Sequence, residues 1–139
     1  SNFTIDYLER LMGESTIIPA VNQIELHPHL SQIALRNYCK QHGIAVESYS
    51  PLGGAGGTLL QEPVLNSIGQ RHSKSPAQVV IRWHLQNGLI AIPKSVTPER
   101  IKQNIDVFDF ELSSEEIEAI NALNVDARVG SDPTTANFT

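Results

Sequence analysis

Cysteine is almost absent from this 139-residue sequence, because Cys39 is the single example. A chain with one cysteine forms no internal disulfide, which favours a reducing, cytosolic setting. Cys39 lies in a helical pattern with Leu35 and Tyr38, so we expect a buried, inert thiol. The five histidines match no standard zinc spacing and have no cysteine cluster beside them, so we expect no metal site.

Long apolar runs and excess positive charge are also missing. No run approaches the roughly 20 residues that span a bilayer, and the first residues show no signal-peptide pattern. Ten Lys and Arg against fifteen Asp and Glu give a formal net charge of -5, which argues against nucleic-acid or anionic-membrane binding. The commonest hydrolase and nucleotide-triphosphatase motifs are absent too. A hydrophobic fraction of 40% predicts one soluble globular domain.

Helical and extended patterns alternate along the chain. Helices are predicted over residues 5–12, 31–41, 62–71, 76–86, 98–104 and 114–123, and strands over residues 20–26, 44–49 and 89–92. In the first strand, Val21, Gln23 and Glu25 should share one face. Strands separated by helices of this length imply right-handed crossovers and parallel pairing. The sequence therefore predicts an α/β protein.

Helix boundaries carry residue signals of their own. Gly13 should end the first helix and Ser31 should cap the second. Ser75 followed by proline should open the fourth helix, and Ser113 with Glu116 forms a capping-box pattern before the last. These signals predict where each helix begins or ends.

One stretch joins a strand directly to a helix start. The apolar run 89–92 is predicted to be a buried strand, Thr97 is a good N-cap, and Pro98 suits the first helical position. Lys94 lies just before this helix and Arg100 one turn inside it. Unpaired backbone N–H groups and two cations favour a bound anion, with a nucleotide phosphate as the natural candidate. The alternative is an ordinary surface helix start with two solvated cations.

A glycine-dense loop follows the second predicted strand, over residues 50–57. Glycines allow backbone N–H groups to come close to a ligand because no Cβ intervenes. Taken alone, the loop also fits a flexible surface crossover.

Three parallel strands are an incomplete arrangement by themselves, because both edges of the sheet would stay exposed. The sequence begins with Ser1, and no strand precedes the first helix. We therefore expect the C-terminal part of a larger α/β fold.

Several motifs occur here in the order and spacing found in the aldo-keto reductases. They lie at residues 1–3, 21–28, 48–53, 75–84 and 92–104. The chain resembles this family over nearly its whole length, and residues 47–48 and 82–86 look most like its bacterial 2,5-diketo-D-gluconate reductase branch. The resemblance implies the C-terminal half of a (β/α)8 TIM barrel, strands 6 to 8 with their helices, and a tail over 124–139.

The resemblance also implies a site for NADPH, assembled from three groups of residues. The nicotinamide carboxamide would contact Ser1, Asn2 and Gln23, and its ring would stack on Tyr49. The pyrophosphate would lie along Ser50, Leu52 and Gly53, with the glycine-rich loop folding over the cofactor and gating its release. The 2′-phosphate and adenosine would meet Lys94, Ser95, Val96, Thr97, Arg100, Gln103 and Asn104. Position 103 is usually Glu in the family, so Gln103 is a departure.

The family reduces an aldehyde or ketone by hydride transfer from NADPH, with a catalytic Asp, Tyr, Lys and His. No matching motif for these four occurs here, so the sequence assigns no catalytic residue. The N-terminal half of the barrel would supply them, and only residues 128–138 would represent the substrate pocket. The alternative function is a non-catalytic half-barrel that binds a nucleotide or a partner.

Overall fold

A computed structural model of the protein describes residues 1–136 as an α/β fold with three strands. The strands are β1 (Val21–Glu25), β2 (Ala45–Tyr49) and β3 (Ile90–Ala91). The helices are α1 (Ile5–Glu14), α2 (Ile33–Gln41), α3 (Pro63–His72), α4 (Pro76–Gln86), α5 (Pro98–Ile105) and α6 (Ser114–Asn121), and a 3-10 turn, η1, covers Leu59–Gln61. No regular element is assigned over 122–136, which we call the C-terminal segment. Each predicted helix and strand is present, whereas η1 was not predicted.

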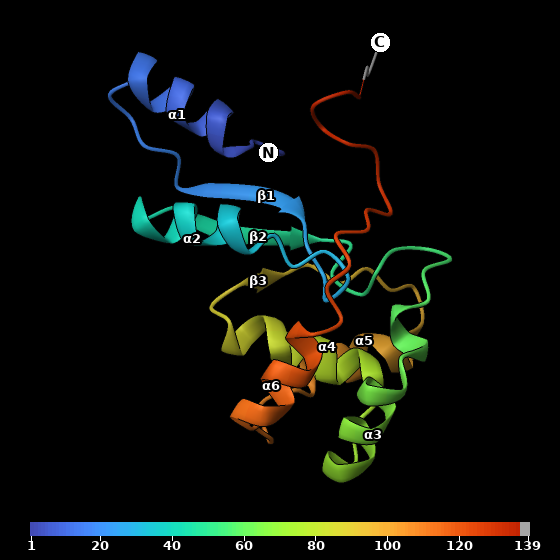
Figure 1. The fold of residues 1–139 in the computed structure, drawn as a ribbon. Coiled ribbons are helices and arrows are strands. Elements are labelled where there is room, and N and C mark those ends of the chain that lie inside the picture. The colour runs from blue at the N-terminus through green and yellow to red at the C-terminus, as the bar shows by residue number, and fades with distance from the viewer. Residues whose placement is uncertain (137–139) are drawn as a thin grey trace.

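The three strands form one parallel sheet in the order β1-β2-β3, as predicted (Figure 1). The register pairs Gln23 with Glu47 and Glu25 with Tyr49, and Ser48 with Ala91 on the other side of β2. Because parallel strands point the same way, their C-terminal ends meet at one edge of the sheet. The glycine-rich loop and residues 92–97 both leave from that edge.

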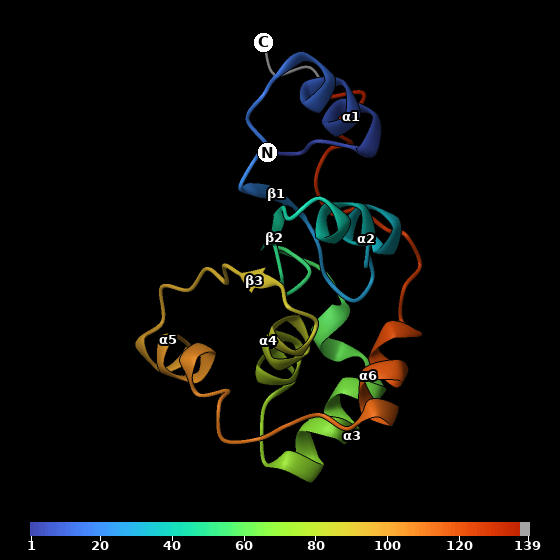
Figure 2. The ribbon, with the colours of Figure 1, turned by 90° about the vertical axis from the view of Figure 1, so that its left-hand side faces the viewer.

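Among residues 1–136, helices cover one face of this sheet and leave the other open. Figure 2 shows α1, α2 and α4 following one another beside the successive strands. The side chains of Asn22, Ile24 and Val46 point toward these helices, and all three are buried. Gln23 and Glu47 point to the opposite, open face, where their side chains are hydrogen-bonded to each other across the strands. The predicted alternation in β1 is thus confirmed.

The core lies between the sheet and α2, α3 and α4. Trp83 is fully buried at its centre, and its indole Nε1 donates to Asn121 Oδ1 on α6 at 2.9 Å. Cys39 is fully buried as predicted, and this burial raises the pKa of its thiol. Within residues 1–136, no helix has the length and apolar character required to cross a membrane.

The two strongest capping signals are confirmed at atomic detail. Ser75 Oγ accepts from Gln78 N at the start of α4, and the Gln78 side chain accepts from Ser75 N in return. Ser113 and Glu116 make the same reciprocal pair at the start of α6. Two donors at each helix start are therefore satisfied locally.

Two other boundary predictions were wrong. Gly13 does not end α1, which continues to Glu14 with Gly13 outside the left-handed region. Ser31 does not cap α2, because the N-cap is Gln32, held at a φ of 46°. Ser31 therefore lies one position too early to cap α2, and its N–H donates to Asn124 Oδ1, 93 residues along the chain.

The prediction of a buried strand over 89–92 was also wrong in part. Leu89 is buried, but Ile90 and Ile92 remain 43% and 42% exposed. The strand β3 covers only two residues and pairs with β2 alone, so it forms an edge of the sheet within residues 1–136. An apolar pattern cannot distinguish an edge strand from a central one.

We expect the isolated 139-residue chain to self-associate, because β1 and β3 both present outer edges with exposed Val21 and Ile90. Sedimentation velocity should show a weight-average mass that rises with concentration. Ile90→Lys should reduce this rise by placing a charge on the β3 edge. A single monomeric species at every concentration would contradict the expectation.

Candidate cofactor site

Residues between 94 and 104 form one wall of a cavity of about 450 Å³ beside the C-terminal edge of the sheet. Leu52 reaches this cavity from the glycine-rich loop. All seven residues predicted for the adenosine end also line it: Lys94, Ser95, Val96, Thr97, Arg100, Gln103 and Asn104. Two cations, two hydroxyl groups and two amides therefore face one space. This chemistry suits a phosphorylated nucleotide.

The start of α5 presents backbone donors to this space. Thr97 occupies the N-cap position and Pro98 the first helical position, as predicted, but the Thr97 side chain makes no capping hydrogen bond. Ser95 Oγ instead accepts from Thr97 N at 3.2 Å, forming a turn ahead of the helix. Without a side-chain cap, the N–H groups of the first turn stay available for an anion.

The start of α4 faces the same cavity, which the sequence did not reveal. Ser75, Pro76, Ala77 and, from η1, Leu60 complete the lining. The Ser-Pro motif gave the helix start correctly, but a helix start does not show which loop lies opposite it. Two helix N-termini thus border one cavity.

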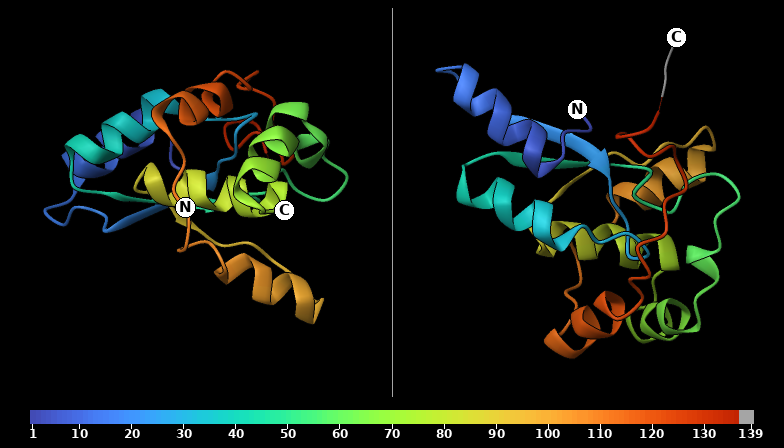
Figure 3. Two further views of the ribbon diagram at one scale, coloured as in Figure 1. Left: turned by 90° about the horizontal axis from the view of Figure 1, so that it is seen from below. Right: turned by 45° about the horizontal axis from the view of Figure 1, so that its top comes forward.

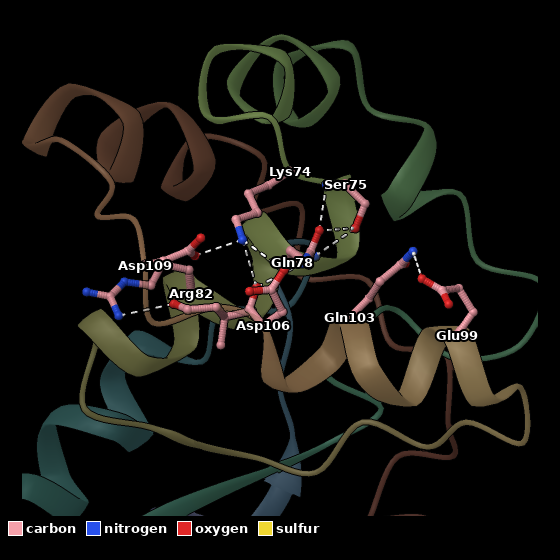
Figure 4. A network of polar contacts seen from close by, with 9 residues as sticks. Lys74, Ser75, Gln78, Arg82, Glu99, Gln103, Asp106 and Asp109 are labelled. Carbon is pink, nitrogen blue, oxygen red and sulfur yellow. Dashed lines mark hydrogen bonds and ion pairs between the residues drawn. The ribbon is translucent and has the colours of Figure 1, made fainter.

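The far end of α5 is fixed to the rest of the molecule by polar contacts (Figure 4). No residue of α5 is buried, and it stands away from the other helices (Figure 3, left). Lys74 Nζ donates to the backbone oxygen of Asp106 at 3.2 Å and to its carboxylate at 3.0 Å, and Gln78 Nε2 donates to the same backbone oxygen at 2.8 Å. Lys74 also pairs with Asp109 at 2.7 Å. These bonds set the position of the helix that carries Arg100.

We expect Gln78→Glu to loosen α5 selectively. Glutamate keeps the acceptor that completes the α4 capping box but loses the donor to the Asp106 backbone oxygen. Loss of about 1 kcal/mol should speed hydrogen exchange of α5 amides about fivefold. Gln86→Glu is the matched control, because Gln86 makes the same kind of contact with Leu112. Equal exchange in α5 for wild type and Gln78→Glu would exclude this anchor.

Gln103 has a partner on its own helix. Its Nε2 lies 3.4 Å from Glu99 Oε1, one turn earlier on α5 (Figure 4). A glutamate at this position would set two like charges four residues apart, which destabilises a helix. Gln103 therefore avoids this repulsion, and its amide can donate to the Glu99 carboxylate.

A second group of predicted residues gathers around β1. Asn2 N donates to Gln23 O at 2.8 Å, and Ser1 Oγ donates to the same oxygen at 3.3 Å. The Asn2 side-chain oxygen is buried and has no hydrogen-bond partner within residues 1–136. An unsatisfied amide oxygen of this kind fits a ligand that brings an N–H donor, such as a carboxamide.

Tyr49 ends β2 on the open face of the sheet, where it is half-buried. Directly after it the chain turns sharply, with Ser50 at a φ of 49° and Gly53 at 84°. A side chain at Gly53 would come within 2.9 Å of Leu59 Cβ, so this turn requires glycine. Tyr49, Ser50, Leu52 and Gly53 thus form a compact corner between the open face and the cavity.

The described residues also form a second hollow and offer no group of metal ligands. A hollow of about 550 Å³ between α1, α2 and the C-terminal segment contains Asp6 and Asp126, which suit an anion poorly. Within residues 1–136, no group of three or more His, Cys, Asp or Glu side chains is arranged to hold a metal ion.

Comparison with known proteins places this geometry in a family. The family model described as "Aldo/keto reductase family" matches residues 1–125. An aldo-keto reductase of Mycolicibacterium smegmatis is 55% identical over 139 residues, covering 100% of this chain and 50% of that protein. Glyoxal reductase of Bacillus subtilis is 51% identical over 133 residues, covering 96% of this chain and 48% of that protein.

Solved structures give the same result. A mutant of Gox0644 crystallised in complex with NADPH superposes with a TM-score of 0.93 at 49% sequence identity, covering 99% of this chain and 50% of that chain. The chain therefore spans about half the length of the relatives it matches. Sequence and structural likeness agree over nearly every residue of the present chain, which belongs to the aldo/keto reductase family.

Proposed function

We propose that this chain supplies most of the NADPH site of a reductase that converts an aldehyde or ketone to an alcohol. Support comes from the cavity beside α5, where Lys94 and Arg100 flank the uncapped helix start. The 2′-phosphate is the group that distinguishes NADPH from NADH, and it would take these two cations and the first-turn N–H groups. The adenine would lie against Gln103 and Asn104.

The nicotinamide end would lie at the open face of the sheet. The unpartnered oxygen of Asn2 would accept from the carboxamide N–H₂, with Ser1 and Gln23 beside it. Tyr49 would support the ring, and Ser50, Leu52 and Gly53 would follow the pyrophosphate between the two ends. The bound cofactor supplies hydride to a carbonyl carbon.

We infer that the proton donor and most of the substrate pocket come from a preceding barrel half, which would complete a TIM barrel around strands 6 to 8. Small carbonyl compounds are the proposed substrates, consistent with the name of the Bacillus relative. Of the predicted pocket segment 128–138, Asn137 and Phe138 lie outside the described residues. The reducing environment favoured by a lone cysteine supports a cytoplasmic location.

The denatured intact mass of the protein from its natural source tests this proposal. A mass about twice 15.3 kDa would match a complete barrel, and NADPH oxidation on adding aldehydes should then be measured on that protein. A mass near 15.3 kDa would contradict the enzyme and support a nucleotide-binding half-barrel. Titration of the isolated chain with NADPH tests the binding site separately.

A further inference from the structure

A fully buried carboxylate lies at the C-terminal end of β1. Glu25 has no exposed surface, yet it accepts hydrogen bonds from two consecutive backbone N–H groups of the C-terminal segment. Val129 N donates to Oε1 at 2.6 Å and Gly130 N donates to Oε2 at 3.0 Å. His27 Nε2 lies 3.1 Å from Oε1 on a third side. More than 100 residues separate this carboxylate from its backbone partners, so the contact holds the two ends of the chain together.

These bonds bring the C-terminal segment onto two parts of the proposed cofactor site. A side chain at Gly54 would come within 2.9 Å of Val129 Cγ1, so Val129 packs directly on the glycine-rich loop. A side chain at Gly130 would lie 3.0 Å from Glu25 Oε2 and 3.9 Å from the Tyr49 hydroxyl. Figures 1 and 3 show the segment passing the C-terminal ends of β1 and β2.

The charge of Glu25 is part of this arrangement. Burial raises the pKa of Glu25, but hydrogen bonds from Val129, His27 and Gly130 outweigh burial and bring the pKa below its ordinary value. The carboxylate is therefore ionised at neutral pH, and each of its oxygens accepts a charge-assisted bond. Arg128 Nη1 adds a longer ion pair at 3.9 Å.

We propose that Glu25 is a positioning residue that fixes residues 128–130 against the glycine-rich loop and Tyr49, forming the outer wall of the nicotinamide end of the site. The proposal rests on the proposed NADPH function. Its physical basis is geometric, because Glu25 and Tyr49 are register partners on the same open face. A segment held on one of them must lie beside the other.

Glu25→Gln is the direct test. Glutamine retains the shape of the side chain, but its N–H₂ cannot accept, so one of the two backbone donors loses its partner. Hydrogen exchange of the Val129 and Gly130 amides should become about tenfold faster or more. Exchange in the glycine-rich loop should rise with it, and NADPH affinity should fall, while the amides of α4 stay protected as in wild type.

Val129→Pro removes the Val129 N–H that donates to Glu25 and leaves the buried carboxylate in place. It provides a second test if Glu25→Gln does not fold. Glu116→Gln is the matched control, because Glu116 also accepts from a histidine, His72 at 2.9 Å, and from a backbone N–H, that of Ser113 at 3.0 Å. The control should leave residues 128–130 unchanged.

Two results would overturn the positioning role. One is unchanged exchange at 128–130 in Glu25→Gln together with unchanged exchange at 128 and 130 in Val129→Pro. The other is faster exchange there with no change in the glycine-rich loop or in NADPH affinity. A wild-type chain that does not bind NADPH would instead contradict the proposed function, and the exchange comparison without nucleotide would still decide whether Glu25 holds the segment.

Discussion

Replacing Arg100 by alanine is expected to weaken NADPH binding about 10- to 100-fold and to leave NADH binding nearly unchanged. Arg100 lies one turn inside α5 and lines the cavity together with Lys94. A hydrogen bond between charged partners contributes about 1.5 to 3 kcal/mol, and only NADPH carries the 2′-phosphate that would form it. The loss should therefore appear in one nucleotide and not in the other.

Calorimetric titration of the wild-type chain and Arg100→Ala with both nucleotides gives this comparison. Lys102→Ala is the matched control, because Lys102 is an exposed cation on the same helix but does not line the cavity. Arg100→Ala should also flatten the dependence of NADPH affinity on salt. Equal losses of affinity for NADPH and NADH would contradict the assignment of the 2′-phosphate to this end of the site.

The second large effect concerns pH and His84, a fully buried residue of α4. Burial lowers the pKa of His84 to about 4. Its Nδ1 lies 2.8 Å from Val80 O and its Nε2 lies 3.2 Å from Leu26 O. A neutral ring has one N–H, which we assign to Nδ1 from the shorter contact. The folded state therefore holds His84 without charge.

We expect the free energy of unfolding to fall by about 2 kcal/mol between pH 7 and pH 5 because of His84. In the unfolded chain the imidazole takes up a proton below about pH 6.5, whereas in the folded chain it does so only near pH 4. The stabilising contribution is therefore complete above pH 6.5 and is lost as the pH falls to 4.

Urea unfolding at half-unit steps from pH 7 to pH 5 measures this slope. Buried His27 has a lowered pKa for the same main reason and contributes in the same direction. The lowered pKa values of Glu25 and Glu116 act at more acidic pH, so this range separates them from His84. His84→Gln should reduce the slope, and His42→Gln, a change at an exposed histidine, should not. An unchanged slope in His84→Gln would refute the assignment.

Local signals predicted most of the fold. Ser75 and Ser113 cap helices because their partners lie three residues away, within the reach of sequence patterns. Ser31 failed as a cap because Gln32, in a left-handed conformation, stands between Ser31 and the first turn of α2, and no local pattern predicts that conformation. The exposure of Ile90 depends on which strand lies beside β3, and that too is a matter of tertiary structure.

The candidate site also has one part that local sequence patterns predict and another part that depends on tertiary structure. Residues 94–104 are contiguous, so a motif could predict that they share one cavity. The contribution of Ala77 from α4 and the contact between Glu25 and Val129 depend on how distant segments meet. The sequence drew attention to Glu25 only as one of three residues on one face of β1, and alternation along a strand does not show what covers a side chain.

The open face of the sheet selects what can cover it. Its hydrogen-bonded Gln23 and Glu47 would be buried by any segment laid across the strands. A purely apolar segment would remove water from the Glu47 carboxylate without replacing it, at a cost of several kcal/mol. A segment whose hydrogen-bond donors lie opposite the Glu47 carboxylate would replace that water and would meet no such cost. The open face therefore selects a covering segment by its polarity as well as by its shape. It disfavours nonspecific packing against the sheet of another molecule.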